Sequence, residues 1–200
     1  MNNFLPREFY DRPALTVARE LLGKYLVRLE DGQRLAGIIL ETEAYCGEGD
    51  LGCHCKAGRT TRTQVMYGPP GHAYVYFTYG KHWMLNFVVE PEGNPAAILI
   101  RAIEPLEGMD FISARRGSQP MQKWTDGPAK ICQALNIDKR FNGVDLCAEG
   151  GVLIVEDAEP VPKLNVKTGP RVGLNSVPEP WKSVPWRYRV NSPQRSQRHE

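Results

Sequence analysis

The chain has 200 residues, of which 42% are hydrophobic, and a formal net charge of +2. This size lets one globular domain, residues 1–200, close a core without disulfides. No apolar run approaches the roughly 20 residues of a membrane helix, and the start lacks the pattern of a secretory signal. We therefore expect no membrane association and an intracellular location, cytoplasm or nucleoid in a bacterium and nucleus in a eukaryote.

The small net charge hides an uneven distribution along the chain. Residues 161–200 carry eight Lys or Arg and two Glu, a net charge of +6, so the remainder carries −4. Residues 51–90 hold four Lys or Arg, one acid and three of the four histidines. Lys and Arg that displace counterions give a protein affinity for nucleic acid, but a solvated charged face has the same composition. Charge alone leaves both interpretations open.

The first predicted element is a helix over residues 14–22, where apolar residues recur at helical spacing. Asp11 can cap this helix, Pro13 is suited to its first turn, and Gly23 is expected to end it. After Gly23 the apolar period changes to two, and Asp31-Gly32 is a hairpin turn signal. The expected strands are 25–29, 35–42, 73–79, 83–90, 96–103 and 152–156.

Two more helices interrupt these strands. One is expected from Pro105 to about residue 116, stopped by Gly117, and the other begins near 126–128 and turns Ile131, Ala134 and Leu135 inward. Strands joined by short turns, with helices in a few blocks, predict an α+β fold: one compact domain with a mainly antiparallel curved sheet and flanking helices.

The C-terminal part, residues 158–200, is rich in proline and basic residues. Trp181, Trp186 and Tyr188 nevertheless need a surface to pack on. We therefore expect this part to belong to the domain, apart from a loose tail over 192–200.

Three segments combine apolar strands with reactive side chains. In the first, Glu41, Glu43 and Tyr45 share one face of a strand end, where acids can also simply be solvated. In the second, residues 72–80, Tyr74 and Tyr76 share a face and Tyr79 precedes Gly80 at a turn tip, where packing cannot use its ring. In the third, Arg101 lies within an apolar strand and needs an acidic partner or a phosphate.

Six motifs occur in a fixed order: ETEAY, a histidine nine residues after its tyrosine, PGHAYVYFTYG, an asparagine seven after the last tyrosine, LIRAIEPLEG and DGPAKICQAL. Together they closely resemble the alkyladenine (3-methyladenine) DNA glycosylase family, from about residue 5 to 190. The resemblance implies a DNA-repair enzyme of one compact mixed α/β domain that needs no cofactor. Its partner would be double-stranded DNA containing damaged purines, and we expect a monomer.

The resemblance also implies roles for individual residues. Glu43 matches the family's catalytic base, which deprotonates the attacking water, and Arg101 matches the arginine that places this water and a nearby phosphate. Tyr45, His54 and Tyr76 match the family residues that form the pocket around the flipped base.

Other matched positions concern the DNA and base selection. Tyr79 matches the side chain wedged into the duplex, and Asn86 the amide that discourages guanine by crowding its exocyclic amine. Met66 and Leu99 match apolar contacts at the DNA surface and pocket wall. Further DNA contacts are expected from Arg59, Arg62 and Lys81, although Arg62-Thr63 departs from the Arg-Asn pair usual in the family.

The residue types suit this chemistry. A glycosylase must extrude its target nucleotide, aromatic rings stack on any base, and a carboxylate stabilises positive charge on the sugar. Alkylated purines are cationic leaving groups that need no general acid, whereas hypoxanthine would need protonation from a donor that the sequence does not name. A non-catalytic damage binder would lack Glu43. A formyltransferase-like domain would need a nucleotide loop or a transfer motif, and the sequence has neither. A lyase would need a lysine within ETEAY or AYVYFTYG to form a Schiff base, and neither segment contains one.

The five cysteines form an odd set that fits reduced thiols better than a disulfide framework. Cys53, His54 and Cys55, with Cys46 nearby, offer metal-binding atoms. Adjacent residues do not easily reach one ion, however, and the usual ligand spacing is absent. We expect no metal site.

Overall fold

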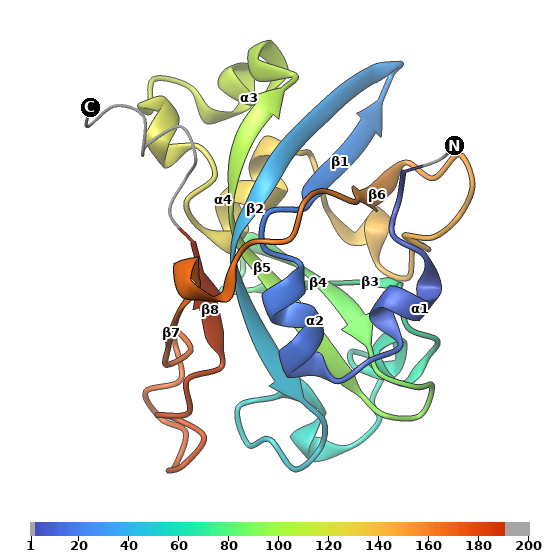
Figure 1. Ribbon diagram of the computed structural model, residues 1–200, viewed down its shortest axis with the longest axis vertical. Helices are drawn as coiled ribbons and strands as arrows, with labels where there is room; N and C mark the ends of the chain where they lie inside the picture. The colour runs from blue at the N-terminus through green and yellow to red at the C-terminus, as the bar shows by residue number, and fades with distance from the viewer. Residues whose placement is uncertain (1–2, 191–200) are drawn as a thin grey trace.

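An antiparallel sheet organises residues 3–190, the part of the chain that the computed structural model describes (Figure 1). Within these residues the sheet has eight strands; its main path is β3-β4-β5-β2-β1-β6, and β8 pairs with both β2 and β7. The strands are β1 (Tyr25–Glu30), β2 (Gln33–Cys46), β3 (Ala73–Thr78), β4 (His82–Val89), β5 (Ala96–Glu107), β6 (Leu153–Glu156), β7 (Lys167–Gly169) and β8 (Arg187–Arg189). The α+β class with a mainly antiparallel sheet is confirmed.

Strand β2 is longer than the expected 35–42 and runs on through Glu43 and Tyr45. It pairs with β5 as far as Cys46, and its other edge pairs first with β1 and then with β8. Glu43 was expected at a strand end. It lies instead within β2, inside the sheet. Neighbours on both edges satisfy the backbone here, so the strand does not need to stop at the polar side chains.

The expected helix start at Pro105 is wrong, because β5 continues to Glu107. Pro105 pairs with Gly37 next to a register shift, where a missing N–H is tolerated. Gly108 follows with φ of 72°, and a Cβ there would lie 2.7 Å from Leu35 Cγ. Helix α3 (Met109–Arg116) starts only after this turn and ends before Gly117, as expected.

The N-terminal helix is also divided differently from the expectation. A short α1 (Arg7–Tyr10) comes first, and Asp11 follows its end instead of capping the next helix. Helix α2 (Ala14–Glu20) begins directly after Pro13 and packs on β2, where Thr42 Oγ1 donates to the carbonyl of Ala18 at 2.7 Å. Pro13 is the N-cap and offers no side-chain acceptor; instead the Glu90 carboxylate accepts the first helical N–H, that of Ala14, at 2.9 Å.

The two faces of the sheet carry two separate cores. The larger one packs under α2 and α4 (Pro128–Ala134), whose Ile131 and Ala134 are buried as expected. The smaller one contains Cys53, Cys55, Met66, Tyr74, Val88 and Ala97. Alternation along the strands divides the residues between them: Val75 joins the larger core and Tyr74 the smaller. Each large side chain so buried contributes about 1.5–3 kcal/mol.

The C-terminal segment up to residue 190 packs on the domain, as expected. Figure 1 shows it in orange and red, ending beside β2. Trp186 and Tyr188 pack against the larger core. The expected loose tail, 192–200, lies outside the described residues. Within 3–190, no helix is long and apolar enough to cross a membrane.

Candidate active site

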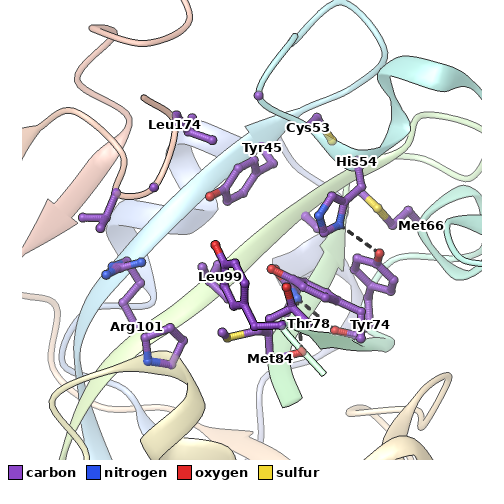
Figure 2. Close-up of a pocket in the computed structure, with 18 residues that line it drawn as sticks. Tyr45, Cys53, His54, Met66, Tyr74, Thr78, Met84, Leu99, Arg101 and Leu174 are labelled. Atoms are coloured by element: carbon purple, nitrogen blue, oxygen red, sulfur yellow. Dashed lines mark hydrogen bonds between the residues drawn. The ribbon is translucent and has the colours of Figure 1, made fainter. Parts of the chain in front are cut away.

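A cavity of about 330 Å³ opens on the face of the sheet that carries the smaller core. Its walls come from β2, β3, β4 and β5, from residues 52–54 and from residues 172–174 (Figure 2). The five expected pocket residues all line it: Tyr45, His54, Tyr76, Asn86 and Leu99. Arg101, Met66 and Tyr79 line it too. Side chains from distant parts of the sequence therefore meet around one space large enough for a small organic ligand.

One wall of the cavity is aromatic. The rings of Tyr74 and Tyr76 lie 5.4 Å apart with a tilt of 33°, and the His54 ring meets Tyr76 edge-on at 4.5 Å. His54 Nδ1 lies 3.1 Å from the Tyr74 hydroxyl (Figure 2). Partial burial of the ring against the tyrosines, together with the charges of Arg62 and Lys56, lowers the pKa of His54 to about 4. His54 is therefore neutral at pH 7.

Glu43 has no exposed surface, and two hydrogen bonds and one ion pair hold its carboxylate. The backbone N–H of Val172 donates to Oε1 at 2.7 Å, Arg101 Nε lies 3.3 Å from the same oxygen, and the Tyr45 hydroxyl donates to Oε2 at 2.9 Å. Burial raises the pKa of Glu43, against the opposing effects of Arg101, Val172 and Tyr45. All three of these residues line the cavity, so Glu43 lies directly behind its wall.

Arg101 has the acidic partners that an arginine in an apolar strand requires. Its Nε lies 2.9 Å from Glu41 Oε1, in addition to the contact with Glu43. Glu41 also lies 3.4 Å from Arg187 Nη1 on β8. The two glutamates and Tyr45 thus share the face that strand alternation predicts.

Sequence reasoning missed a buried ion pair beside this carboxylate. Arg171 and Asp50 have no exposed side-chain surface, and the guanidinium donates to both carboxylate oxygens. The guanidinium also lies 4.7 Å from the ring centroid of Tyr45 and 5.1 Å from that of Trp186. Because Arg171 precedes Val172 in the chain, the pair holds in place the backbone N–H that contacts Glu43. The sequence shows Arg171 only as a lone arginine within GPRVG, and no neighbouring residue indicates that its partner is Asp50.

The cavity reaches the surface at the β3–β4 turn, and the cations expected to contact DNA are exposed. Tyr79 is 81% exposed at the β3–β4 turn, with φ of 51°, and Gly80 has φ of 67°. Such a turn normally carries Asn or Gly, so tyrosine there is strained. Arg59, Arg62 and Lys81 are all exposed, and the Arg62 guanidinium lies 4.9 Å from the Tyr76 ring.

Met66 does not lie where a contact with the DNA surface would place it. Its side chain is 1% exposed and belongs to the smaller core at the cavity wall. Met66 therefore lines the cavity, as Leu99 does.

The Cys53-His54-Cys55 motif contributes to both the wall and the core behind it. Both thiols are free and buried, and their Sγ atoms lie 2.7 Å apart. His54 turns instead toward Tyr74 and Arg62. Among residues 3–190, no group of three or more His, Cys, Asp or Glu side chains is arranged to hold a metal ion.

Comparison with known proteins shows the family of the chain. Residues 8–194 match the family model described as Methylpurine-DNA glycosylase (MPG). A protein of Methanocella arvoryzae is 49% identical over 94% of both chains, and one of Myxococcus xanthus is 46% identical over 96% of this chain and 92% of its own. Both carry the name "Putative 3-methyladenine DNA glycosylase". The chain therefore belongs to the methylpurine-DNA glycosylase family.

Proposed function

We propose that the protein removes alkylated and deaminated purines from duplex DNA by hydrolysing the N-glycosidic bond, with Glu43 as the base that activates water, leaving an abasic site. The observation that carries this proposal is the Glu43 carboxylate, fully buried behind the wall of an aromatic cavity and held by two hydrogen bonds and the ion pair with Arg101. A buried, preorganised carboxylate stabilises positive charge far better than one in water.

The cavity suits a base that has left the duplex. An atom inside a stacked duplex is out of reach, so the nucleotide must rotate out, at a cost of a few kcal/mol. The Tyr79 ring projects at the cavity mouth and can fill the space that the nucleotide leaves. Tyr45, Tyr76 and His54 then surround the base. Stacking on such rings is worth on the order of 1–3 kcal/mol and tolerates different purines.

Cleavage of the bond between the base and the sugar leaves positive charge on the sugar. The ionised Glu43 stabilises this charge and accepts a proton from the attacking water. Because Glu43 has no exposed surface, water reaches it only when the Tyr45 hydroxyl or the Val172 segment moves aside. We assign this movement to substrate binding. Arg101, paired with Glu41 and Glu43, holds the carboxylate in place meanwhile.

The leaving group decides whether an acid is needed. A purine alkylated at N3 or N7 is already a cation and departs without protonation. A neutral deaminated purine needs a proton, and His54 does not supply it at pH 7 because its pKa is about 4. Asn86 donates its Nδ2 to the Tyr74 carbonyl at 3.1 Å and lines the cavity, where it crowds the exocyclic amine of guanine.

The test is the substitution Glu43→Gln, which keeps the shape of the side chain and removes its proton affinity. Single-turnover release of 3-methyladenine from a defined duplex should fall by at least about 10²–10⁴-fold. Binding of the same duplex should persist, because the stacking surfaces are unchanged. Glu107→Gln, an exposed change at the far end of β5, is the matched control. Release by Glu43→Gln near the wild-type rate would refute Glu43 as the base.

A further inference from the structure

The proposed function leaves the thiols of Cys53 and Cys55 unused. Cys53 and Cys55 are 1% and 0% exposed, and their sulfur atoms lie 2.7 Å apart. A disulfide bond measures about 2.03–2.05 Å, so the two sulfurs need to approach by less than about 1 Å to form one. The other cysteines have different surroundings: Cys132 belongs to the larger core, and Cys46 and Cys147 pack against its edge.

The two thiols differ in their access to the cavity. Cys53 forms part of the cavity wall, whereas Cys55 lies behind it, with its Sγ 3.1 Å from the carbonyl oxygen of Pro95. A small, uncharged oxidant that enters the cavity therefore meets Cys53 first. The hydrogen bond between the sulfurs raises the pKa of Cys53 and lowers that of Cys55, so Cys55 can accept the proton of Cys53.

We propose that Cys53 and Cys55 form a peroxide-sensitive dithiol, which closes to a disulfide in the cavity wall. Cys53 passes its proton to Cys55, and the Cys53 sulfur attacks one oxygen of hydrogen peroxide; the O–O bond breaks, and Cys53 becomes a sulfenic acid with loss of hydroxide. The Cys55 sulfur then attacks the Cys53 sulfur, the S–O bond breaks and a second hydroxide leaves. The two thiol protons and the two hydroxides form two molecules of water.

The position of the second thiol explains why the reaction stops at the disulfide. An isolated sulfenic acid can be oxidised further to sulfinic acid, whereas a neighbouring thiol traps it first. The ring so formed encloses His54, whose imidazole contacts Tyr74 and Tyr76. The reaction needs only the cavity and the two thiols, and it is independent of the chemistry proposed at Glu43.

The experiment treats the reduced full-length protein with one equivalent of hydrogen peroxide. Free thiols are then alkylated in denaturant, and trypsin with a glutamyl endopeptidase cuts after Lys56 and Glu48. The resulting peptide, 49–56, contains Cys53 and Cys55 but not Cys46. Mass spectrometry should find this peptide two hydrogen atoms lighter and without alkyl groups. Dithiothreitol before alkylation should restore two alkyl groups.

Two variants make the result specific. Cys46→Ser should form the same disulfide, whereas Cys55→Ser should accumulate sulfenic or sulfinic acid at Cys53. If Cys55→Ser does not fold, the wild-type peptide decides alone. The proposal is overturned if peptide 49–56 keeps both thiols, gains oxygen atoms without a disulfide, or is found joined to Cys46.

Discussion

The cavity has a buried end and an exposed end that are built from different interactions. At the buried end, Glu43, Asp50 and Arg171 have no exposed side-chain surface, and each charge has a partner. At the exposed end, Tyr79 and Lys81 project into solvent. A buried charge that loses its partner destabilises the fold, whereas an exposed side chain contributes little to it. Substitutions at the two ends should therefore separate folding from binding.

The largest effect is expected from Asp50→Asn at the buried end. It leaves the Arg171 cation buried without a counterion, so the free energy of unfolding should fall by about 3–5 kcal/mol. Urea denaturation measures this change. Asp126→Asn, which breaks the more exposed pair with Lys130, is the control and should cost less than about 1 kcal/mol. Equal losses would show that burial does not distinguish the two pairs.

The second prediction concerns the pH dependence of base release, which is set by Glu43 at the buried end of the cavity. Base catalysis needs the ionised Glu43, and burial, opposed by the contacts that hold its carboxylate, raises its pKa above the ordinary 4.5. The protonated fraction grows as pH falls, so base release should decline about tenfold for each unit below that raised pKa. Single-turnover rates over pH 4–8, with duplex binding measured alongside, test this. A decline that begins only below pH 4.5 would contradict it.

At the exposed end, Tyr79→Ala should weaken base flipping and leave stability unchanged. Loss of the ring should shift the equilibrium toward the stacked nucleotide by about 1–2 kcal/mol, judged from base–aromatic stacking. Fluorescence of ethenoadenine in a duplex reports this shift, and thermal melts report stability. Tyr79→Phe should restore the signal because it retains the ring. A lowered melting temperature for Tyr79→Ala would mean that the side chain supports the fold.

The smallest effect is expected for the cations at the cavity mouth. If Arg59 and Lys81 each contact a phosphate, each alanine variant should reduce the slope of log affinity against log salt by about 0.9. Arg19→Ala on α2, which covers the opposite face of the sheet, is the matched control. Identical slopes for all three variants and the wild type would remove these cations from the DNA interface.

Features that depend on neighbouring residues could be predicted from the sequence. Alternation along β3 places Tyr74 and Tyr76 on one face, and the Tyr79-Gly80 turn leaves its ring exposed, as expected. The same reasoning predicts that Arg101 needs an acidic partner or a phosphate, and the structure provides the acidic partner in Glu41. In each case the physical cause acts within one element or one adjacent pair of strands.

Features that depend on tertiary contacts could not be predicted in this way. Pro105 reads as a helix start, yet pairing with β2 keeps it in β5. Asp50 and Arg171 lie far apart in the chain, and their pairing depends on how the C-terminal segment crosses the sheet. This segment contains little regular secondary structure and many prolines, so its sequence has no periodic pattern from which its path across the sheet could be predicted.

The position of the C-terminal segment in the chain also sets an order of assembly during synthesis. Strands β1 to β6 are complete by Glu156, whereas Arg171, Val172 and β8 follow later. At roughly 5–20 residues per second, β8 leaves the ribosome about 2–6 seconds after β6. A nascent chain can thus pair its main sheet while Glu43 still lacks the Val172 N–H and Asp50 its counterion. The polar interior is finished last, so a chain that ends before Arg171 does not carry the assembled site.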